Sequence, residues 1–218
     1  TNNPILTIGG NYSSASGTTL FKNNSRLLTI SGTTSNGGLF THSGTGGVTF
    51  TGTFTNTSTG TYNQSGSGAV TANNVVSNSG TYTQSGSGTA AFNAAFNSTG
   101  TGVYNHSGTG TFTALSTTNN AGTFNQSATS LAYFQGAVTN SGTVNLTGSG
   151  ALTNANTTSN TGLYNSNGAG LLTFSSTATN SGSGSITQNS TGTILFSAVF
   201  NNSSAGSTFT QTSNGTTT

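Results

Sequence analysis

The chain has 218 residues, of which 29% are hydrophobic and 1% are charged, with two basic residues, two histidines and no Asp, Glu or Cys. This inventory excludes disulfides, thiolate metal sites and any catalytic mechanism that requires a carboxylate. Two cations are too few for a nucleic-acid or membrane surface, and the apolar runs are too short for a transmembrane helix.

The first predicted elements form an incomplete coil over residues 1–19, in which Leu6, Ile8 and Tyr12 are expected to point inward. Leu20 then begins a regular frame, because large residues return at steps of 20 to 23 residues. One repeat of this length is typical of one turn of a solenoid. Low apolar content usually indicates disorder, but disordered chains also carry high net charge, which is missing here. We name the repeated positions the core ladder: Phe40, Tyr62, Tyr82, Tyr104, Phe124, Val144, Tyr164, Ile186 and Phe209.

Each repeat contains further apolar residues at even distances from the core ladder. After Tyr82, for example, Ala90, Phe92 and Phe96 follow 8, 10 and 14 residues later. The residues between them are mostly Thr, Ser, Asn and Gly, so the period is two, as in strands with one buried face. Each repeat therefore predicts three short strands.

Two kinds of corner separate these strands. Six residues after each core-ladder position the chain usually has Gly, as at Gly88, where we expect a positive φ or a tight bend. Sixteen residues after it the chain has Asn in every coil but one, where it has Ser98. Asn tolerates the left-handed conformation, and its stacked amides can hydrogen-bond between coils. The longer repeats fit insertions just after this second corner, as at 181–184. We name these residues the Asn corner ladder: Asn56, Asn78, Asn120, Asn140, Asn160, Asn180 and Asn202.

These patterns predict an all-β fold, a single-chain parallel β-helix of about ten coils of 20–23 residues. One domain spans residues 1–218, with an incomplete N-terminal coil (1–19), regular coils (20–208) and an incomplete C-terminal coil (209–218). A right-handed helix is expected, because parallel β-crossovers are almost always right-handed.

His42 and His106 are the only candidates for acid–base or metal chemistry. Both lie two residues after a core-ladder position, where other coils carry Gln64, Gln84 and Gln126. They are three coils apart, and the chain contains no carboxylate or thiol to complete a triad or a zinc site. We therefore expect two substitutions in a stacked polar ladder, with no catalytic, metal or cofactor site, and a protein that is not an enzyme.

The residues on either side of the core ladder point outward and form an uncharged double file of hydroxyls and amides. One interpretation is that Thr suits a strand and keeps the rod soluble; the other is a recognition face for ice, a glycan or a neighbouring rod. Sequons such as that at Asn145 permit glycosylation. We name the double file the Thr/Asn face: Thr61, Asn63, Thr81, Thr83, Thr123, Asn125, Thr143 and Asn145.

Phrases such as those over 78–88 (NSGTYTQSGSG) and 137–146 (AVTNSGTVNL) resemble β-strand-repeat bacterial surface proteins, the filamentous-haemagglutinin-like and autotransporter-passenger β-helices. The resemblance covers 20–215 and implies secretion, a β-helix and an adhesive or fibrous role. The Thr files also resemble those of β-solenoid ice-binding proteins.

The favoured function is therefore a structural subunit of an extracellular fibre or cell-surface appendage. It would assemble head to tail, with Thr1–Tyr12 of one subunit docking on the C-terminal coil of the next. The alternative is an adhesin or an ice- or glycan-binding solenoid that uses the Thr/Asn face. The expected partners are further copies of the chain, and glycans or surfaces in the alternative, but not nucleic acid or a membrane.

Overall fold

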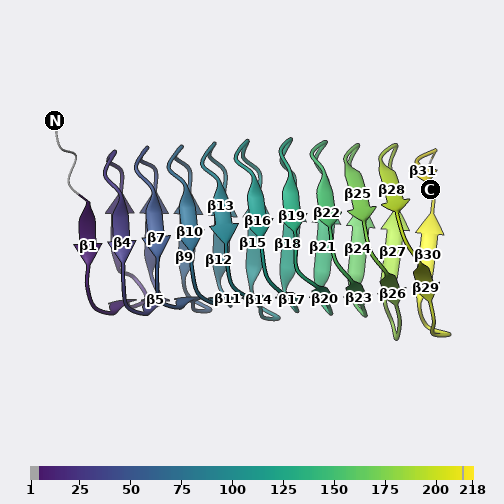
Figure 1. The fold of residues 1–218 in the computed structure, drawn as a ribbon, viewed down its shortest axis with the longest axis horizontal. Coiled ribbons are helices and arrows are strands. Elements are labelled where there is room, and N and C mark those ends of the chain that lie inside the picture. Colours follow the sequence, from purple (N-terminus) through teal and green to yellow (C-terminus); the bar gives the residue numbers. More distant parts are fainter. Residues whose placement is uncertain (1–4, 213) are drawn as a thin grey trace.

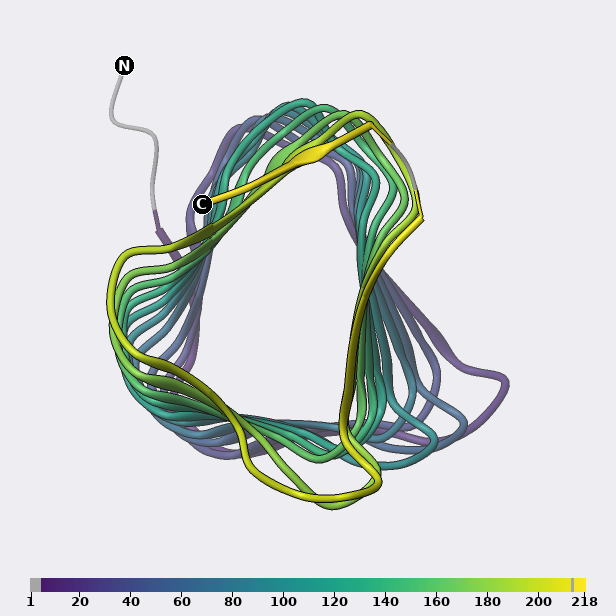
Figure 2. The same cartoon turned by 90° about the vertical axis from the view of Figure 1, so that its right-hand side faces the viewer.

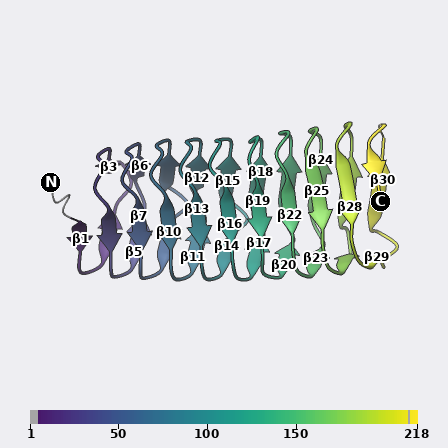
Figure 3. The ribbon, with the colours of Figure 1, turned by 45° about the horizontal axis from the view of Figure 1, so that its top comes forward.

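The computed structural model describes residues 5–212 and 214–218, and within them every regular element is a β-strand. Their 31 short strands form three parallel sheets, and each turn of the chain adds one strand to each sheet (Figures 1 and 3). The predicted all-β parallel solenoid is confirmed. The described residues make about eleven turns rather than the expected ten, because one sheet has 11 strands and the other two have 10.

Successive strands of each sheet are about one coil apart in sequence. Sheet A contains β1 (Leu6–Ile8), β4 (Leu28–Ile30), β7 (Val48–Phe50), β10 (Val70–Ala72), β13 (Ala90–Phe92), β16 (Phe112–Ala114), β19 (Ala132–Phe134), β22 (Leu152–Asn154), β25 (Leu171–Phe174), β28 (Thr193–Phe196) and β31 (Thr216–Thr217). Sheet B contains β2 (Tyr12–Ser14), β5 (Thr34–Asn36), β8 (Phe54–Asn56), β11 (Val76–Asn78), β14 (Phe96–Ser98), β17 (Thr118–Asn120), β20 (Val138–Asn140), β23 (Thr158–Asn160), β26 (Ala178–Asn180) and β29 (Phe200–Asn202). Sheet C contains β3 (Thr19–Lys22), β6 (Leu39–His42), β9 (Thr61–Gln64), β12 (Thr81–Gln84), β15 (Val103–His106), β18 (Thr123–Gln126), β21 (Thr143–Leu146), β24 (Leu163–Ser166), β27 (Ser185–Gln188) and β30 (Thr208–Gln211).

The three sheets enclose a roughly triangular core (Figure 2). Seen from the C-terminal end, the chain runs anticlockwise as it approaches the viewer, so the solenoid is right-handed (Figure 2). The longer turns protrude at the single corner between sheets B and C, the position expected for the insertions (Figure 2).

Strand pairing places each core-ladder residue directly over the next one. Tyr62 pairs with Phe40 on one side and Tyr82 on the other, and Tyr104 continues the stack. The ring centroids are 4.6 Å apart between Tyr62 and Tyr82 and 4.7 Å apart between Tyr82 and Tyr104. Each such ring pair adds about 0.5–1.5 kcal/mol beyond its buried area. The core ladder is buried from Phe40 to Ile186, whereas Phe209 in the last coil is only half-buried.

The corner glycines have a different role from the one expected. Among the described residues, only Gly17 and Gly182 have a positive φ, and both lie in the longer turns between sheets B and C. Of the two conformations expected six residues after the core ladder, the structure therefore shows the tight bend, as at Gly88, and not the positive φ. No described Asn adopts the left-handed conformation. At Gly88, a Cβ atom would lie 2.1 Å from the carbonyl oxygen of Gly68 in the preceding coil. Close backbone approach between coils, rather than turn geometry, excludes a side chain there.

We predict that Phe92→Ala lowers the free energy of unfolding by about 3–5 kcal/mol, the usual cost of removing a buried Phe ring. Phe92 is 1% exposed and contacts the rings of Tyr82, Phe96 and Phe112. Denaturant unfolding would measure the change, with Thr113→Ala at the outward position of β16 as the control. Equal losses in the two variants would contradict the inward placement of Phe92.

Candidate functional site

The Asn corner ladder lies inside the solenoid, at the end of each strand of sheet B. Where the next coil also carries Asn, the side-chain amide donates a hydrogen bond to the amide oxygen of that Asn, over 2.8 Å from Asn140 to Asn160 and 2.8 Å from Asn160 to Asn180. It also donates to a backbone oxygen at the start of sheet C, as Asn56 does to Thr81 over 3.0 Å. The ladder therefore joins successive coils and fastens the corner between the two sheets. All its members are buried except Asn202, which is exposed in the last coil.

One position interrupts the Asn corner ladder. Ser98 stands at a position that Asn occupies in the other coils from Asn36 to Asn202, and its hydroxyl donates to the carbonyl of Gly102 over 3.3 Å rather than to the next coil. The amide oxygen of Asn120 in that next coil is consequently buried without a hydrogen-bond partner. Such an unmet acceptor costs about 1–3 kcal/mol.

A second internal ladder runs along the C-terminal ends of the sheet C strands, two residues after the core ladder. The Gln84 amide donates to the carbonyl of Gly88 over 2.9 Å, and its oxygen accepts the hydroxyl of Tyr104 in the next coil over 2.9 Å. Tyr82 donates in the same way to Gln64 over 3.2 Å. We name this set the Gln ladder: Gln64, Gln84, Gln126, Gln188 and Gln211, with His42 and His106 at the same position in their own coils.

His42 and His106 are fully buried members of the Gln ladder. Their Nε2 atoms lie 2.7 Å and 2.6 Å from the carbonyl oxygens of Gly46 and Gly110, so Nε2 carries the proton. Each Nδ1 atom is then a buried acceptor without a hydrogen-bond partner. The hydroxyl of Tyr62 is also buried without a partner, because the preceding coil carries His42 at the position where other coils carry Gln. Within the described residues, no three potential metal-ligating side chains of the His, Cys, Asp or Glu type come together.

Burial lowers the pKa of both histidines. For His42 the positive charge of Lys22 lowers the pKa further, while the hydrogen bond to Gly46 opposes the shift. For His106 the hydrogen bond to the carbonyl of Gly110 and the nearby side chain of Gln126 oppose the shift. Both side chains are therefore neutral structural members of the ladder near neutral pH.

Sequence reasoning missed the role of Lys22, which occupies the Gln-ladder position in β3. Its side chain is 3% exposed, and its ammonium donates to the carbonyl oxygens of Asn24 over 2.9 Å and Gly46 over 3.2 Å. Burial lowers its pKa. The spacing from Leu20 to Lys22 equals that from Phe40 to His42, so the signal was present in the sequence. One of the two cationic side chains is therefore part of the interior and does not contribute a charged surface.

The Thr/Asn face occupies the outer side of sheet C. Its eight residues alternate along their strands with buried residues and are themselves half-buried. In the middle of the face Asn125 donates to Asn105 over 2.8 Å and Asn145 donates to Asn125 over 2.8 Å, and Asn165 extends the file over 2.9 Å. These amides thus satisfy one another, and Thr83 separates them from Asn63.

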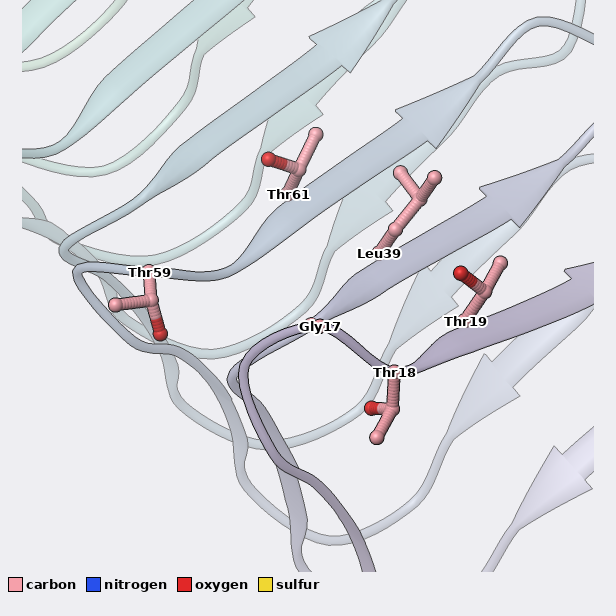
Figure 4. A pocket seen from close by; sticks show the side chains of 7 residues that line it. Gly17, Thr18, Thr19, Leu39, Thr59 and Thr61 are labelled. Atoms are coloured by element: carbon pink, nitrogen blue, oxygen red, sulfur yellow. The ribbon is translucent and has the colours of Figure 1, made fainter.

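A small hollow lies at the N-terminal end of this face (Figure 4). Its volume is about 210 Å³, and it opens between the long turns of the first and third coils. The hydroxyls of Thr18 and Thr59 already donate to the carbonyls of Ala15 and Gly37, over 2.6 Å and 2.8 Å. The hollow is smaller than most ligand pockets, which measure about 300–1,000 Å³. Its lining is uncharged: Gly17, Thr18, Thr19, Gly38, Leu39, Thr59 and Thr61.

Comparison with known proteins gave no match to any family model, curated protein or solved structure. Among the described residues there is no helix long and apolar enough to cross a membrane.

We predict that Ser98→Asn raises the free energy of unfolding by about 1–2 kcal/mol. The introduced amide would donate to the unpartnered oxygen of Asn120 and accept from the amide of Asn78, as in the other coils. Denaturant unfolding is the measurement, and Ser159→Asn, at an exposed outward position of β23, is the matched control. A neutral or destabilising effect of Ser98→Asn would show that this gap in the ladder has no cost.

We predict that stability is nearly constant in acid except for the contribution of His42 and His106. The unfolded histidine pKa is about 6.5 and the folded pKa values are lower, so below about pH 6.5 the unfolded chain binds more protons. As the pH is lowered below about 6.5, the free energy of unfolding therefore decreases, until the pH is below the lowered folded pKa values. Melting temperatures between pH 8 and pH 3 would show this decline. A decline of the same size in a His42→Gln/His106→Gln variant would contradict the assignment.

Proposed function

We propose that this chain is a structural, rod-forming subunit of an extracellular fibre or cell-surface appendage, in which rods join end to end by stacking of coils. The role is of the kind that the β-strand-repeat surface proteins perform, which the sequence resembles. The observation that carries the proposal is that apolar side chains of the first and last described coils, such as Leu6 and Phe209, are exposed or only half-buried.

The first coil presents apolar side chains that a further coil would cover. Leu6 is 52% exposed, and Ile8, Tyr12 and Leu20 pack only partly against the core. Residues 1–4 of the docking segment expected over Thr1–Tyr12 lie outside the described residues, so β1 and β2 represent it here. Apolar area of this kind contributes about 25 cal/mol per Å² when it is buried.

The last coil presents a matching surface. Phe196, Phe200 and Phe209 are only partly buried, and the rings of Phe200 and Phe209 lie 5.7 Å apart. Neither of these end coils carries an exposed charged side chain in its strands. Exposed strand edges without charges favour pairing with another edge.

The interior supports a structural role and not a catalytic one. The histidines and Lys22 are buried and hydrogen-bonded to backbone carbonyls, so we propose that the protein is not an enzyme. The exterior carries no side-chain carboxylate whose titration would alter its charge, which suits an extracellular surface exposed to changing pH.

A second candidate function is recognition of a glycan or of ice through the Thr/Asn face. The observation in its favour is the fixed register of Thr61 and Thr81 and of Asn125 and Asn145 on one uncharged sheet. The mutual hydrogen bonds of the central amides weigh against it, because those groups are partly occupied. A recognition module would stay monomeric and bind its ligand with the end coils altered.

We predict that the purified chain forms unbranched filaments and that Leu6→Lys suppresses them. An ammonium group at a stacked junction would lose its hydration without gaining a counter-ion, because the chain has no carboxylate side chain. Leu6 is half exposed, so the substitution should leave the fold intact. Negative-stain microscopy and sedimentation would measure assembly, with Thr71→Lys on the outer face of β10 as the control. A wild-type chain that stays monomeric at high concentration would overturn the proposal.

A further inference from the structure

Exposed apolar side chains gather on the outer side of sheet A, between β16 and β28. Leu115 is 43% exposed, Leu131 is 37% exposed and Leu171 is 38% exposed. Tyr133 and Leu195 point outward from β19 and β28 on the same side. We name this set the sheet A patch: Leu115, Leu131, Tyr133, Leu171 and Leu195. An exposed apolar patch on a polar surface is typical of an interaction site.

The strand at the centre of the sheet A patch presents only small side chains. Along β22 the outward residues are Ala151, Thr153 and Ala155. The strand register places Leu131 one coil before Ala151 and Leu171 one coil after it. β22 is therefore a low row with larger side chains on both sides, and a second surface of complementary shape can approach closely there.

The outward residues on the two sides of β22 are complementary in size. Tyr133 lies one coil before Thr153, and Thr173 lies one coil after it. Thr173 points outward and is yet only 8% exposed, which indicates a shallow depression between larger neighbours. Apart from Leu131 and Leu171, each large residue of the patch has a small residue at the same distance on the other side of β22. These pairs are Tyr133 with Thr173, Leu195 with Thr113, and Leu115 with Ser197.

We propose that the outer side of sheet A pairs with the same side of a second copy of this chain, the two rods lying antiparallel about a twofold axis that runs along β22. Such an axis places each strand over the strand at the same distance on the other side of β22. Tyr133 of one copy then fits over Thr173 of the other, and Leu131 lies over Leu171. Thr153 meets its own counterpart on the axis. The inference goes beyond the proposed end-to-end assembly, because it uses only outward side chains of β16 to β28.

Charge and area determine how strongly the two copies bind. The chain has no charged residue after Arg26, so the two faces neither repel one another nor attract a charged partner. The five strands β16, β19, β22, β25 and β28, about 4.8 Å apart, with five residues along each, cover about 400 Å² per copy, or about 800 Å² in total. Interfaces of this size are weak and reversible. We therefore expect a dimer that dissociates on dilution.

A parallel arrangement of two copies fits this surface less well. A twofold axis along the rods would place Tyr133 against Tyr133 and Leu171 against Ser175. The first contact sets two large rings against each other, and the second sets an apolar side chain against a hydroxyl. The size pattern therefore favours antiparallel rods.

Charged substitutions on the axis test the pairing, because Thr153 would face its own counterpart. Thr153→Lys and Thr153→Glu are made in a Leu6→Lys background, in which end-to-end assembly should be suppressed. Leu6→Lys alone should dimerise reversibly in sedimentation equilibrium. Each Thr153 variant alone should stay monomeric, because like charges meet, and an equimolar mixture of the two should regain the dimer. Thr83→Lys and Thr83→Glu, at an outward position of β12, are the controls and should leave the dimer unchanged.

A Leu6→Lys chain that stays monomeric at all concentrations would overturn the pairing, as would a mixture of the Thr153 variants that forms no dimer. Circular dichroism of each variant controls for folding. Reversible dimers of the Leu6→Lys chain would support the pairing even if the unmodified chain formed no filaments, so the side-by-side and end-to-end contacts are tested separately.

Spin labels measure the relative direction of the two rods, because the chain has no cysteine of its own. Thr49 points outward from β7, which lies five strands from β22 in sheet A. Labels on Thr49→Cys should therefore be about 48 Å apart along antiparallel rods. In parallel rods they would face each other across about 10 Å, and such a short distance would overturn the proposed axis.

Tyr133→Ala tests the contact that the size pattern predicts. Each dimer would lose two rings that fit over Thr173, so the dissociation constant should rise roughly tenfold or more. Thr71→Ala, at an outward position of β10 outside the patch, is the control and should leave it unchanged. An equal effect of the two substitutions would show that the sheet A patch does not form the contact.

Discussion

Parallel backbone hydrogen bonding between successive coils holds each residue of this solenoid directly over its counterpart in the previous coil. Every side chain must therefore be compatible with a near copy of itself about 4.8 Å away. Aromatic rings meet this condition by stacking, and amides meet it by donating to one another, as Tyr62 and Tyr82 or Asn140 and Asn160 do. A repeated charge would instead face a like charge in every layer. The same constraint accounts for a chain that is rich in Asn, Thr and Gly and almost free of charged residues.

The polar interior depends on two ladders that are complete only where their neighbours match. The Gln ladder needs a Gln in one coil and a Tyr in the next, so His42 leaves the Tyr62 hydroxyl without a partner and Val144 leaves the Gln126 oxygen without one. One exception is compensated within the core. Leu146 removes the acceptor for the Tyr164 hydroxyl, and Asn154, in place of an apolar residue, donates to that hydroxyl over 3.3 Å. Asn154 thus supplies one hydrogen bond where Leu146 cannot, while its own amide oxygen is buried without a partner.

The arrangement of polar groups also bears on function. Amides hydrogen-bond along the rod, inside at Asn160 and outside at Asn125, and these bonds stabilise the stack. The same amide groups are then less available for hydrogen bonds to a ligand. The end coils show the reverse situation, because Leu6 and Phe209 have no counterpart on one side. These partly covered apolar side chains are the basis of the proposed end-to-end assembly.

Periodicity alone was sufficient to predict most of this fold. The even spacing of Tyr82, Ala90, Phe92 and Phe96 predicted the strands and their buried side, because a strand has a period of two wherever it lies. The sequence also determined the coil register and the corner that takes the insertions. Only the tertiary structure decided why Gly88 has no side chain and where the ammonium of Lys22 is bound. Those facts depend on distances between coils that are far apart in sequence, and a one-dimensional pattern records which residues meet but not how closely their atoms approach.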